Sequence, residues 1–229
     1  MKKKIIVSAG ACVLFILLIV LVRVVDVKTV EETGKSIGFF ALNSGFHRLT
    51  GLKERWYDLT QIMGYISIAA GLVFAVIGLI QLIRRKNLWK VDRRILALGV
   101  LFIVMGIVYA LFEIVAVNYR PVIMPGETKV EASFPSSHTV LVCVVMSGVA
   151  LMLNYYIKDR RLRVSLQAVC MLFVLITVFG RLICGCHWFT DIIGGLLISV
   201  SLIAAFMAYL DKYDHDEEAL RARLGQKED

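Results

Sequence analysis

The chain has 229 residues, of which 59% are hydrophobic, and its mean hydropathy is +0.76. This hydropathy lies far above that of soluble globular domains, so an ordinary water-soluble enzyme is excluded. The formal net charge is +8, but the basic residues stand between hydrophobic segments. They therefore indicate orientation in a membrane, and no nucleic-acid partner is expected.

Six hydrophobic stretches are long enough, or nearly so, to cross the hydrocarbon core, which takes about 20 apolar residues in a helix. The connections between most of them are short, which favours a single domain over residues 1–229. The sequence thus predicts an all-α integral membrane bundle of six transmembrane helices. The predicted spans are residues 5–25, 61–83, 95–118, 138–157, 164–183 and 187–210.

The longest connection, residues 26–60, has a helical stripe of apolar residues and predicts an amphipathic helix in the membrane interface. Such a helix could shape access of lipid to a site or merely bridge two spans. His47 is expected to be an exposed polar residue, and the aromatic pair Trp56 and Tyr57 to anchor the second span at the interface. The stripe consists of Ile37, Phe40, Ala41, Phe46 and Leu49.

Lys and Arg are concentrated before the first span, between the second and third spans, and between the fourth and fifth. The alternate connections are less basic, and residues 119–137 contain only Arg120 and Lys129. By the positive-inside rule, both termini and the short charged tail 211–229 are expected in the cytoplasm, with the protein in the cell membrane.

This topology places three charged motifs on the outer face of the membrane, where ionisable residues at membrane depth usually have a function. They are Arg120-Pro121 after the third span, Pro135-Ser136-Ser137-His138 at the start of the fourth, and Arg181 with His187 and Asp191 between the fifth and sixth. Each motif alone has an ordinary structural explanation, such as a helix end. Their convergence on one face predicts a site that could hold and attack a phosphate.

The spacing within these motifs suggests roles. His187 and Asp191 are four residues apart at the start of the sixth span, so a carboxylate could orient the imidazole. Ser136 stands at a helix N-cap, where its hydroxyl and the following amides would face an anion. Arg120 and Arg181 provide forked donors that match phosphate oxygens. Cys184 and Cys186 lack further ligands for a metal and are expected to pack.

At these residues the chain resembles the type 2 phosphatidic acid phosphatase family, which shares its core with vanadium haloperoxidases. The family pattern is Lys-x6-Arg-Pro, Pro-Ser-Gly-His and Ser-Arg-x5-His-x3-Asp. Here the three motifs extend over residues 113–191 and begin with Glu113, Pro135 and Gly180.

The resemblance implies a lipid phosphatase that works through a phosphohistidine. His187 would attack phosphorus, Asp191 would support it, and His138 would protonate the leaving oxygen and then activate water. Arg120, Arg181, Ser136 and Ser137 would hold the phosphoryl group. Neither a metal nor another cofactor is implied. The expected partners are a lipid phosphate, of the undecaprenyl diphosphate, phosphatidylglycerophosphate or phosphatidate type, and the bilayer, with no obligatory protein partner.

The main departure from the family pattern is Glu113, which reverses the charge of a lysine that binds phosphate. Glu113 could hold Arg120 or Arg181, contact a cationic head group, or be offset by Lys129, and it is expected to alter substrate preference. Two alternatives stay open: a lipid phosphotransferase of the same fold, and a non-catalytic protein that binds or transports lipid phosphates.

Overall fold

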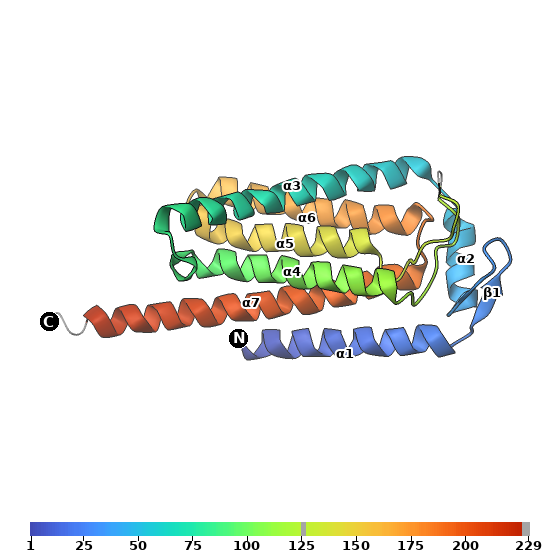
Figure 1. Cartoon of the computed structure of the whole chain (residues 1–229), viewed down its shortest axis with the longest axis horizontal. Coiled ribbons are helices and arrows are strands. Elements are labelled where there is room, and N and C mark those ends of the chain that lie inside the picture. Colours follow the sequence, from blue (N-terminus) through green and yellow to red (C-terminus); the bar gives the residue numbers. More distant parts are fainter. Residues whose placement is uncertain (125–126, 226–229) are drawn as a thin grey trace.

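The computed structural model describes residues 1–124 and 127–225, and of residues 220–225 the backbone alone. Six of its helices are long and apolar enough to cross a membrane, which confirms the all-α six-span bundle (Figure 1). These helices are α1 (Lys2–Val24), α3 (Glu54–Arg85), α4 (Arg93–Ile114), α5 (Ser137–Tyr156), α6 (Arg160–Ile183) and α7 (Phe189–Gly225).

Helix α5 is the centre of the bundle. Its most apolar 18-residue window is 67% buried, whereas the corresponding windows of α1, α3 and α4 are 17% buried. Val142, Val144 and Met152 of α5 have no exposed surface. The outer helices instead expose large apolar side chains such as Ile6 and Ile83 along their length. Exposed apolar surface of this extent suits contact with lipid, since apolar side chains are not disfavoured in the hydrocarbon core.

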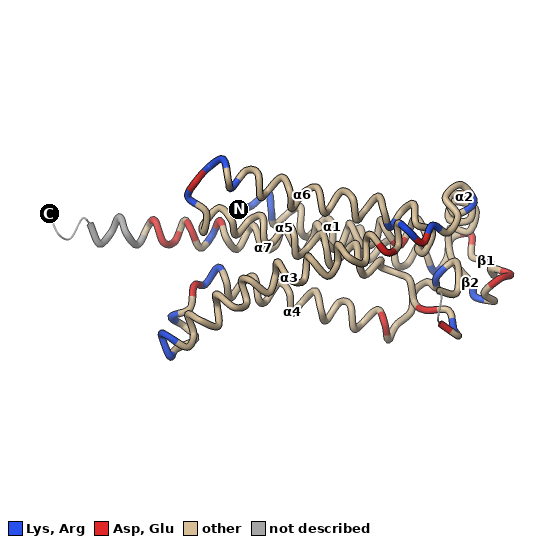
Figure 2. Tube along the Cα trace, turned by 90° about the horizontal axis from the view of Figure 1, so that it is seen from above, with Lys and Arg blue, Asp and Glu red and all other residues tan. Residues whose placement is uncertain are grey.

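Charged residues gather at the two ends of the bundle, while the middle of each helix is almost free of them (Figure 2). Both termini lie at one end, together with the α3–α4 and α5–α6 connections (Figure 1). The connection between α3 and α4 contains the short 3-10 helix η1 (Leu88–Lys90). The opposite end contains the three motifs that were predicted to form the site.

The long connection between α1 and α3 contains the expected helix and, in addition, a hairpin that was not predicted. Strands β1 (Lys28–Val30) and β2 (Lys35–Ile37) pair antiparallel, and α2 (Phe40–Thr50) lies across the end of the bundle (Figure 1). Ile37 belongs to β2 and is buried, so it is not part of the helical stripe.

Polar side chains of α2 contact the bundle, and His47 is half-buried, not exposed as predicted. The Asn43 side chain is buried and hydrogen-bonds to the start of α7: its Nδ2 donates to Thr190 Oγ1 at 3.0 Å, and its Oδ1 accepts from the Thr190 amide at 3.2 Å. The ring of His47 packs edge-on against Trp188, with centroids 5.5 Å apart. Helix α2 is therefore a cover over the site end of the bundle as well as a connection.

Three predicted helix boundaries also differ from the structure. Helix α3 begins at Glu54, so Trp56 and Tyr57 lie within its first turn and not before it. Helix α4 ends at Ile114, four residues before the predicted end. Helix α7 continues to Gly225, well into the charged segment that was predicted to be a short tail.

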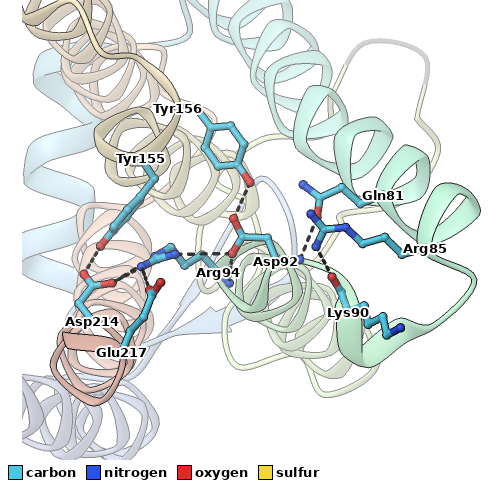
Figure 3. Close-up of polar contacts among 9 residues, drawn as sticks. All are labelled: Gln81, Arg85, Lys90, Asp92, Arg94, Tyr155, Tyr156, Asp214 and Glu217. Carbon is cyan, nitrogen blue, oxygen red and sulfur yellow. Dashed lines mark hydrogen bonds and ion pairs between the residues drawn. The ribbon is translucent and has the colours of Figure 1, made fainter. Parts of the chain in front are cut away.

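The extension of α7 is held by a cluster of charged and aromatic residues at the end opposite α2 (Figure 3). Arg94 donates from Nη2 to Asp214 Oδ1 at 2.7 Å and to Glu217 Oε2 at 2.8 Å. Its guanidinium also lies over the rings of Tyr155 and Tyr213, 4.5 and 4.7 Å from their centroids. Neighbouring contacts bind this cluster to the α3–α4 connection and involve Gln81, Arg85, Lys90, Asp92 and Tyr156.

Helix α1 packs chiefly along α7. Two serines bind the pair of helices reciprocally, since the hydroxyl of Ser8 donates to the Ser201 carbonyl and that of Ser201 to the Ser8 carbonyl, each at 2.9 Å. Near the N-terminus, Lys4 Nζ lies 2.7 Å from Asp211 Oδ1.

Candidate active site

A cavity of about 350 Å³ opens between α3, α4 and α5 and reaches His138 and His187. Most of its wall is apolar. The polar side chains among its lining residues include Gln61, Tyr109 and Glu113. The apolar lining includes Ile68, Met105, Val108, Phe112, Phe134 and Leu141. Such a cavity suits a ligand with a hydrocarbon chain and one polar end.

His187 lies in the loop before α7, whereas its spacing from Asp191 had suggested a position on the helix. Its Nδ1 is nevertheless 3.6 Å from Asp191 Oδ2, beyond a normal hydrogen bond but close enough for the carboxylate to orient the ring. The same carboxylate oxygen accepts from the Trp188 amide at 2.9 Å. Asp191 thus fixes the loop as well as the imidazole.

Two further buried residues, Asn118 and Ser133, face the Asp191 carboxylate. They come from the connection between α4 and α5, where the Ser133 amide donates to the Asn118 carbonyl at 2.9 Å. None of the contacts to Asp191 Oδ1 has the geometry of a full hydrogen bond. Neither residue was predicted, although each lies two positions before a predicted motif, at Arg120 and at Pro135.

The start of α5 meets the start of α7 directly. The Ser136 amide donates to the Asp191 backbone carbonyl at 3.0 Å, which joins the second motif to the third. Ser136 is the N-cap of α5, as predicted, but its hydroxyl is fully buried and accepts from Thr139 Oγ1 at 3.0 Å. Ser137 lines the cavity. A Cβ at Gly195 would meet Thr139 at 3.0 Å, so the close approach of the helices favours a glycine there.

Arg120 was predicted at the end of the third span, but it lies in the connection beyond α4. Its Nε is 2.9 Å from Glu131 Oε2, and its amide donates to the Glu131 carbonyl at 3.0 Å. The carboxylate partner of Arg120 is therefore Glu131 and not Glu113. The neighbouring pair Tyr119 and Ala132 forms an isolated antiparallel bridge that supports this arrangement.

Arg181 is completely buried near the end of α6. Its Nη2 donates to Gln61 Oε1 at 2.7 Å, its Nη1 lies 3.5 Å from Cys186 Sγ, and its guanidinium lies over the ring of Tyr57 at 4.9 Å. Tyr57 thus contacts the site and is more than an interfacial anchor. Within the part of the chain that the structure describes, Arg181 makes no ion pair.

Four site side chains contain buried nitrogen atoms without a hydrogen-bond partner among the described residues: Arg120 Nη1, Arg181 Nε, His138 Nδ1 and His187 Nε2. The two arginines and His187 all interact electrostatically with His138, so the four groups form one cluster. Native proteins rarely leave buried donors unpaired unless a ligand, ion or water satisfies them. The cluster therefore has the character of an anion site.

The loop that precedes His187 is tightly packed. Gly185 has a φ of 74°, and a Cβ there would stand 1.9 Å from the Gly51 carbonyl oxygen, so the loop requires glycine at this position. Cys184 and Cys186 are buried with their sulfur atoms 2.7 Å apart. Their mutual hydrogen bond lowers the pKa of Cys186 to about 5 and raises that of Cys184.

Burial lowers the pKa of His187 to about 3, and the charges of Arg120 and Arg181 contribute in the same direction. At neutral pH the His187 imidazole is therefore neutral and has a lone pair available. Burial also lowers the pKa of His47, which had been predicted to be exposed.

Glu113 lies in the last turn of α4, is exposed, and lines the cavity close to Tyr109. The structure does not pair it with Arg120 or Arg181. Lys129 is exposed and is not among the residues that line the cavity. Glu113 instead makes one rim of the cavity negative.

Comparison with known proteins agrees with the motifs. Residues 112–214 match the PAP2 superfamily. The fold is similar to the crystal structure of a transmembrane PAP2-type phosphatidylglycerolphosphate phosphatase from Bacillus subtilis, with a TM-score of 0.64 and 14% identity; the match covers 90% of this chain and 96% of that chain. No curated protein matches the sequence.

The bundle is that of a multi-pass membrane protein, and the matched residues 112–214, which include the buried cationic cluster, support the lipid-phosphatase class. Over these residues the chain is similar to the type 2 phosphatidic acid phosphatases, which supports a phosphoric monoester hydrolase.

Proposed function

We propose that the protein hydrolyses a lipid phosphomonoester or diphosphate through a phosphohistidine on His187. The observation that supports this most is the cluster of unpartnered nitrogens of Arg120, Arg181, His138 and His187, in which the two histidines line an apolar cavity. The cavity would hold the first part of the lipid chain, while the cluster would bind the phosphoryl oxygens.

In the first step, the neutral Nε2 of His187 attacks phosphorus and the bond from phosphorus to the lipid oxygen breaks. His138, in its protonated form, donates a proton to that oxygen and the lipid alcohol leaves. Asp191, 3.6 Å from His187 Nδ1, stabilises the positive charge of the phosphorylated ring.

In the second step, the now neutral His138 removes a proton from water, and the water oxygen attacks phosphorus. The bond between phosphorus and His187 Nε2 breaks, inorganic phosphate leaves, and both histidines return to their starting states. Arg120 and Arg181 stabilise the charge on the phosphoryl oxygens in both steps, because they are held in place before the reaction begins.

The basic connections at the end opposite α2 support an orientation with both termini in the cytoplasm and the site at the outer face of the cell membrane. The candidate substrates are undecaprenyl diphosphate, phosphatidate and phosphatidylglycerophosphate, the last being the substrate class named for the Bacillus subtilis protein of similar fold. Glu113 at the cavity rim would favour a head group that can donate hydrogen bonds to a carboxylate.

The test is phosphate release by detergent-purified protein from a panel of these lipids, with and without orthovanadate. Vanadate imitates the five-coordinate transition state, so it should inhibit. His187→Ala and His138→Ala should each lose at least about a hundredfold in kcat. His215→Ala is the matched control, because His215 is 82% exposed in the extension of α7 and should leave the rate unchanged.

Quenching with alkaline detergent during turnover should trap a phosphorylated protein that is labile to acid and stable to base, and peptide mapping should place the phosphoryl group on His187. If wild type releases no more phosphate than His187→Ala on every lipid, the proposed hydrolysis is wrong. If phosphate release is normal but the label resides on another residue, the mechanism is wrong and the activity stands.

A further inference from the structure

Gln61 is the polar side chain that connects the cavity with Arg181. It lies in α3 and lines the cavity together with His138 and His187. Arg181 itself is completely buried and is not among the lining residues. A ligand in the cavity therefore meets Gln61 before it meets Arg181. None of the three charged motifs includes Gln61.

The contact between Gln61 and Arg181 leaves the arginine charge intact. Gln61 Oε1 accepts from Arg181 Nη2 at 2.7 Å, and a neutral amide oxygen fixes a guanidinium without cancelling its charge. Arg120 is different, because its Nε lies 2.9 Å from the Glu131 carboxylate. The two arginines are thus held by different partners, since Arg181 contacts the Gln61 amide oxygen and the Cys186 sulfur, and Arg120 contacts a carboxylate.

The chemistry of the side chains also fixes the orientation of the amide. A guanidinium has donors and no acceptor, so the Gln61 oxygen must be the atom that faces Arg181. The Gln61 NH2 group consequently points away from Arg181, and Gln61 is one of the residues that line the cavity. Its two N–H groups are neutral donors of the kind that bind phosphoryl oxygens.

We propose that Gln61 is a phosphate-binding residue of this site: its NH2 group donates to a phosphoryl oxygen in the cavity, while its Oε1 holds Arg181 in position. This assignment rests on the proposed function, since the ligand is the phosphoryl group of the substrate. It extends the phosphate site beyond the three motifs onto α3, so that the anion is held between α3, the start of α5 and the end of α6.

Two substitutions separate the two roles of the amide. Gln61→Glu keeps the shape and the oxygen that holds Arg181, but it removes the donors and places a negative charge beside the anion. Gln61→Met keeps the approximate length and removes both the donor and the acceptor. Gln81→Glu and Gln81→Met are matched controls on the same helix, where Gln81 Oε1 accepts from the Asp92 amide at 2.8 Å at the opposite end of the bundle.

The experiment measures binding of orthovanadate to detergent-purified protein by calorimetry, together with KM and kcat on the best lipid substrate. Loss of a hydrogen bond to a charged group should weaken vanadate binding by about tenfold to a hundredfold in Gln61→Met. Gln61→Glu should weaken it at least as much, and KM should rise more than kcat falls. Both Gln81 variants should stay within about twofold of wild type.

Wild-type affinity for vanadate in Gln61→Met would overturn the assignment, and wild-type affinity in Gln61→Glu would overturn the donor role. Gln61→Asn, which keeps the amide but shortens its reach, replaces Gln61→Met if that variant does not fold, and it should lose affinity in the same range. Because vanadate binding needs no turnover, failure of the proposed hydrolysis would appear as an inactive wild type that still binds vanadate through Gln61.

Discussion

Replacing Gly64 by alanine should slow catalysis without unfolding the protein. Gly64 lies on α3 opposite His138, and a Cβ at this position would stand 3.2 Å from His138 Cδ2 and 3.5 Å from its Nε2. Carbon atoms in contact are normally about 3.5–4.0 Å apart. The imidazole must therefore move by about 0.3–0.5 Å, which would displace the proton donor from the leaving oxygen.

The expected magnitude follows from this displacement. A misplacement of about 1 Å can reduce a rate about a hundredfold, so 0.3–0.5 Å corresponds to a fall in kcat of about fourfold to tenfold. Stability should change little. Alanine is favoured over glycine in a helix by about 1 kcal/mol, and this gain opposes a crowding cost of about 1–3 kcal/mol.

The assay compares kcat and thermal unfolding of Gly64→Ala with those of Gly71→Ala. Gly71 lies seven residues further along the same helix, and a Cβ there would meet Phe102 and Val145 at 3.2 Å each, away from the histidines. Both variants should have similar unfolding temperatures, but Gly71→Ala should keep the wild-type kcat. Equal rates in the two variants at equal stability would refute the assignment of His138 as the proton donor.

Three further predictions concern charge. Arg94→Met should lower the free energy of unfolding by about 1–4 kcal/mol, which is the sum of two partly exposed ion pairs and two cation–π contacts. It should leave kcat unchanged. Thermal unfolding measures the loss of stability, with Arg93→Met, at an exposed position, as the control. The contribution of His187 to the free energy of unfolding should be constant above about pH 6.5, the ordinary pKa of histidine, and should fall towards pH 3, because the unfolded chain protonates His187 in that range while the folded protein, with a His187 pKa of about 3, does not. Denaturant titrations at pH 4.5 and 7.5 should therefore show a smaller fall in His187→Gln than in wild type. Glu113→Lys should lower KM for an anionic lipid phosphate by about twofold to tenfold, with little change in kcat. Added salt should diminish the difference in KM between the variant and wild type. A KM that is unchanged at low salt would contradict a role for the charge of Glu113.

The six helices could be predicted from the sequence because crossing a bilayer imposes length and hydropathy on each segment. Their ends could not. Helix α3 begins seven residues before the apolar stretch 61–83, since polar residues such as Asp58 and Thr60 fit a helix outside the hydrocarbon core. The hairpin at Lys28–Ile37 also escaped prediction, because two strands of three residues give too little alternation to be recognised.

The motifs of the site could be predicted because charged residues are rare in so apolar a chain. The residues that hold them in place were harder to find. Asn118 and Ser133 are small polar residues in a connection, where such residues are common, and only packing brings them to Asp191. One feature of the sequence indicates a role for Gln61: it is a polar residue at the start of a predicted span.

The pairing of α1 with α7 has a consequence for how the protein is made. Ribosomes deliver the chain from its N-terminus, so α1 enters the membrane before the other five described spans, while its chief partner α7 enters after them. Until then the hydroxyl groups of Ser8 and Ser201 lack each other's carbonyls, and Lys4 lacks Asp211. Until α7 is inserted, α1 therefore lies in the lipid beside the helices between them, and α7 completes this packing when it binds α1.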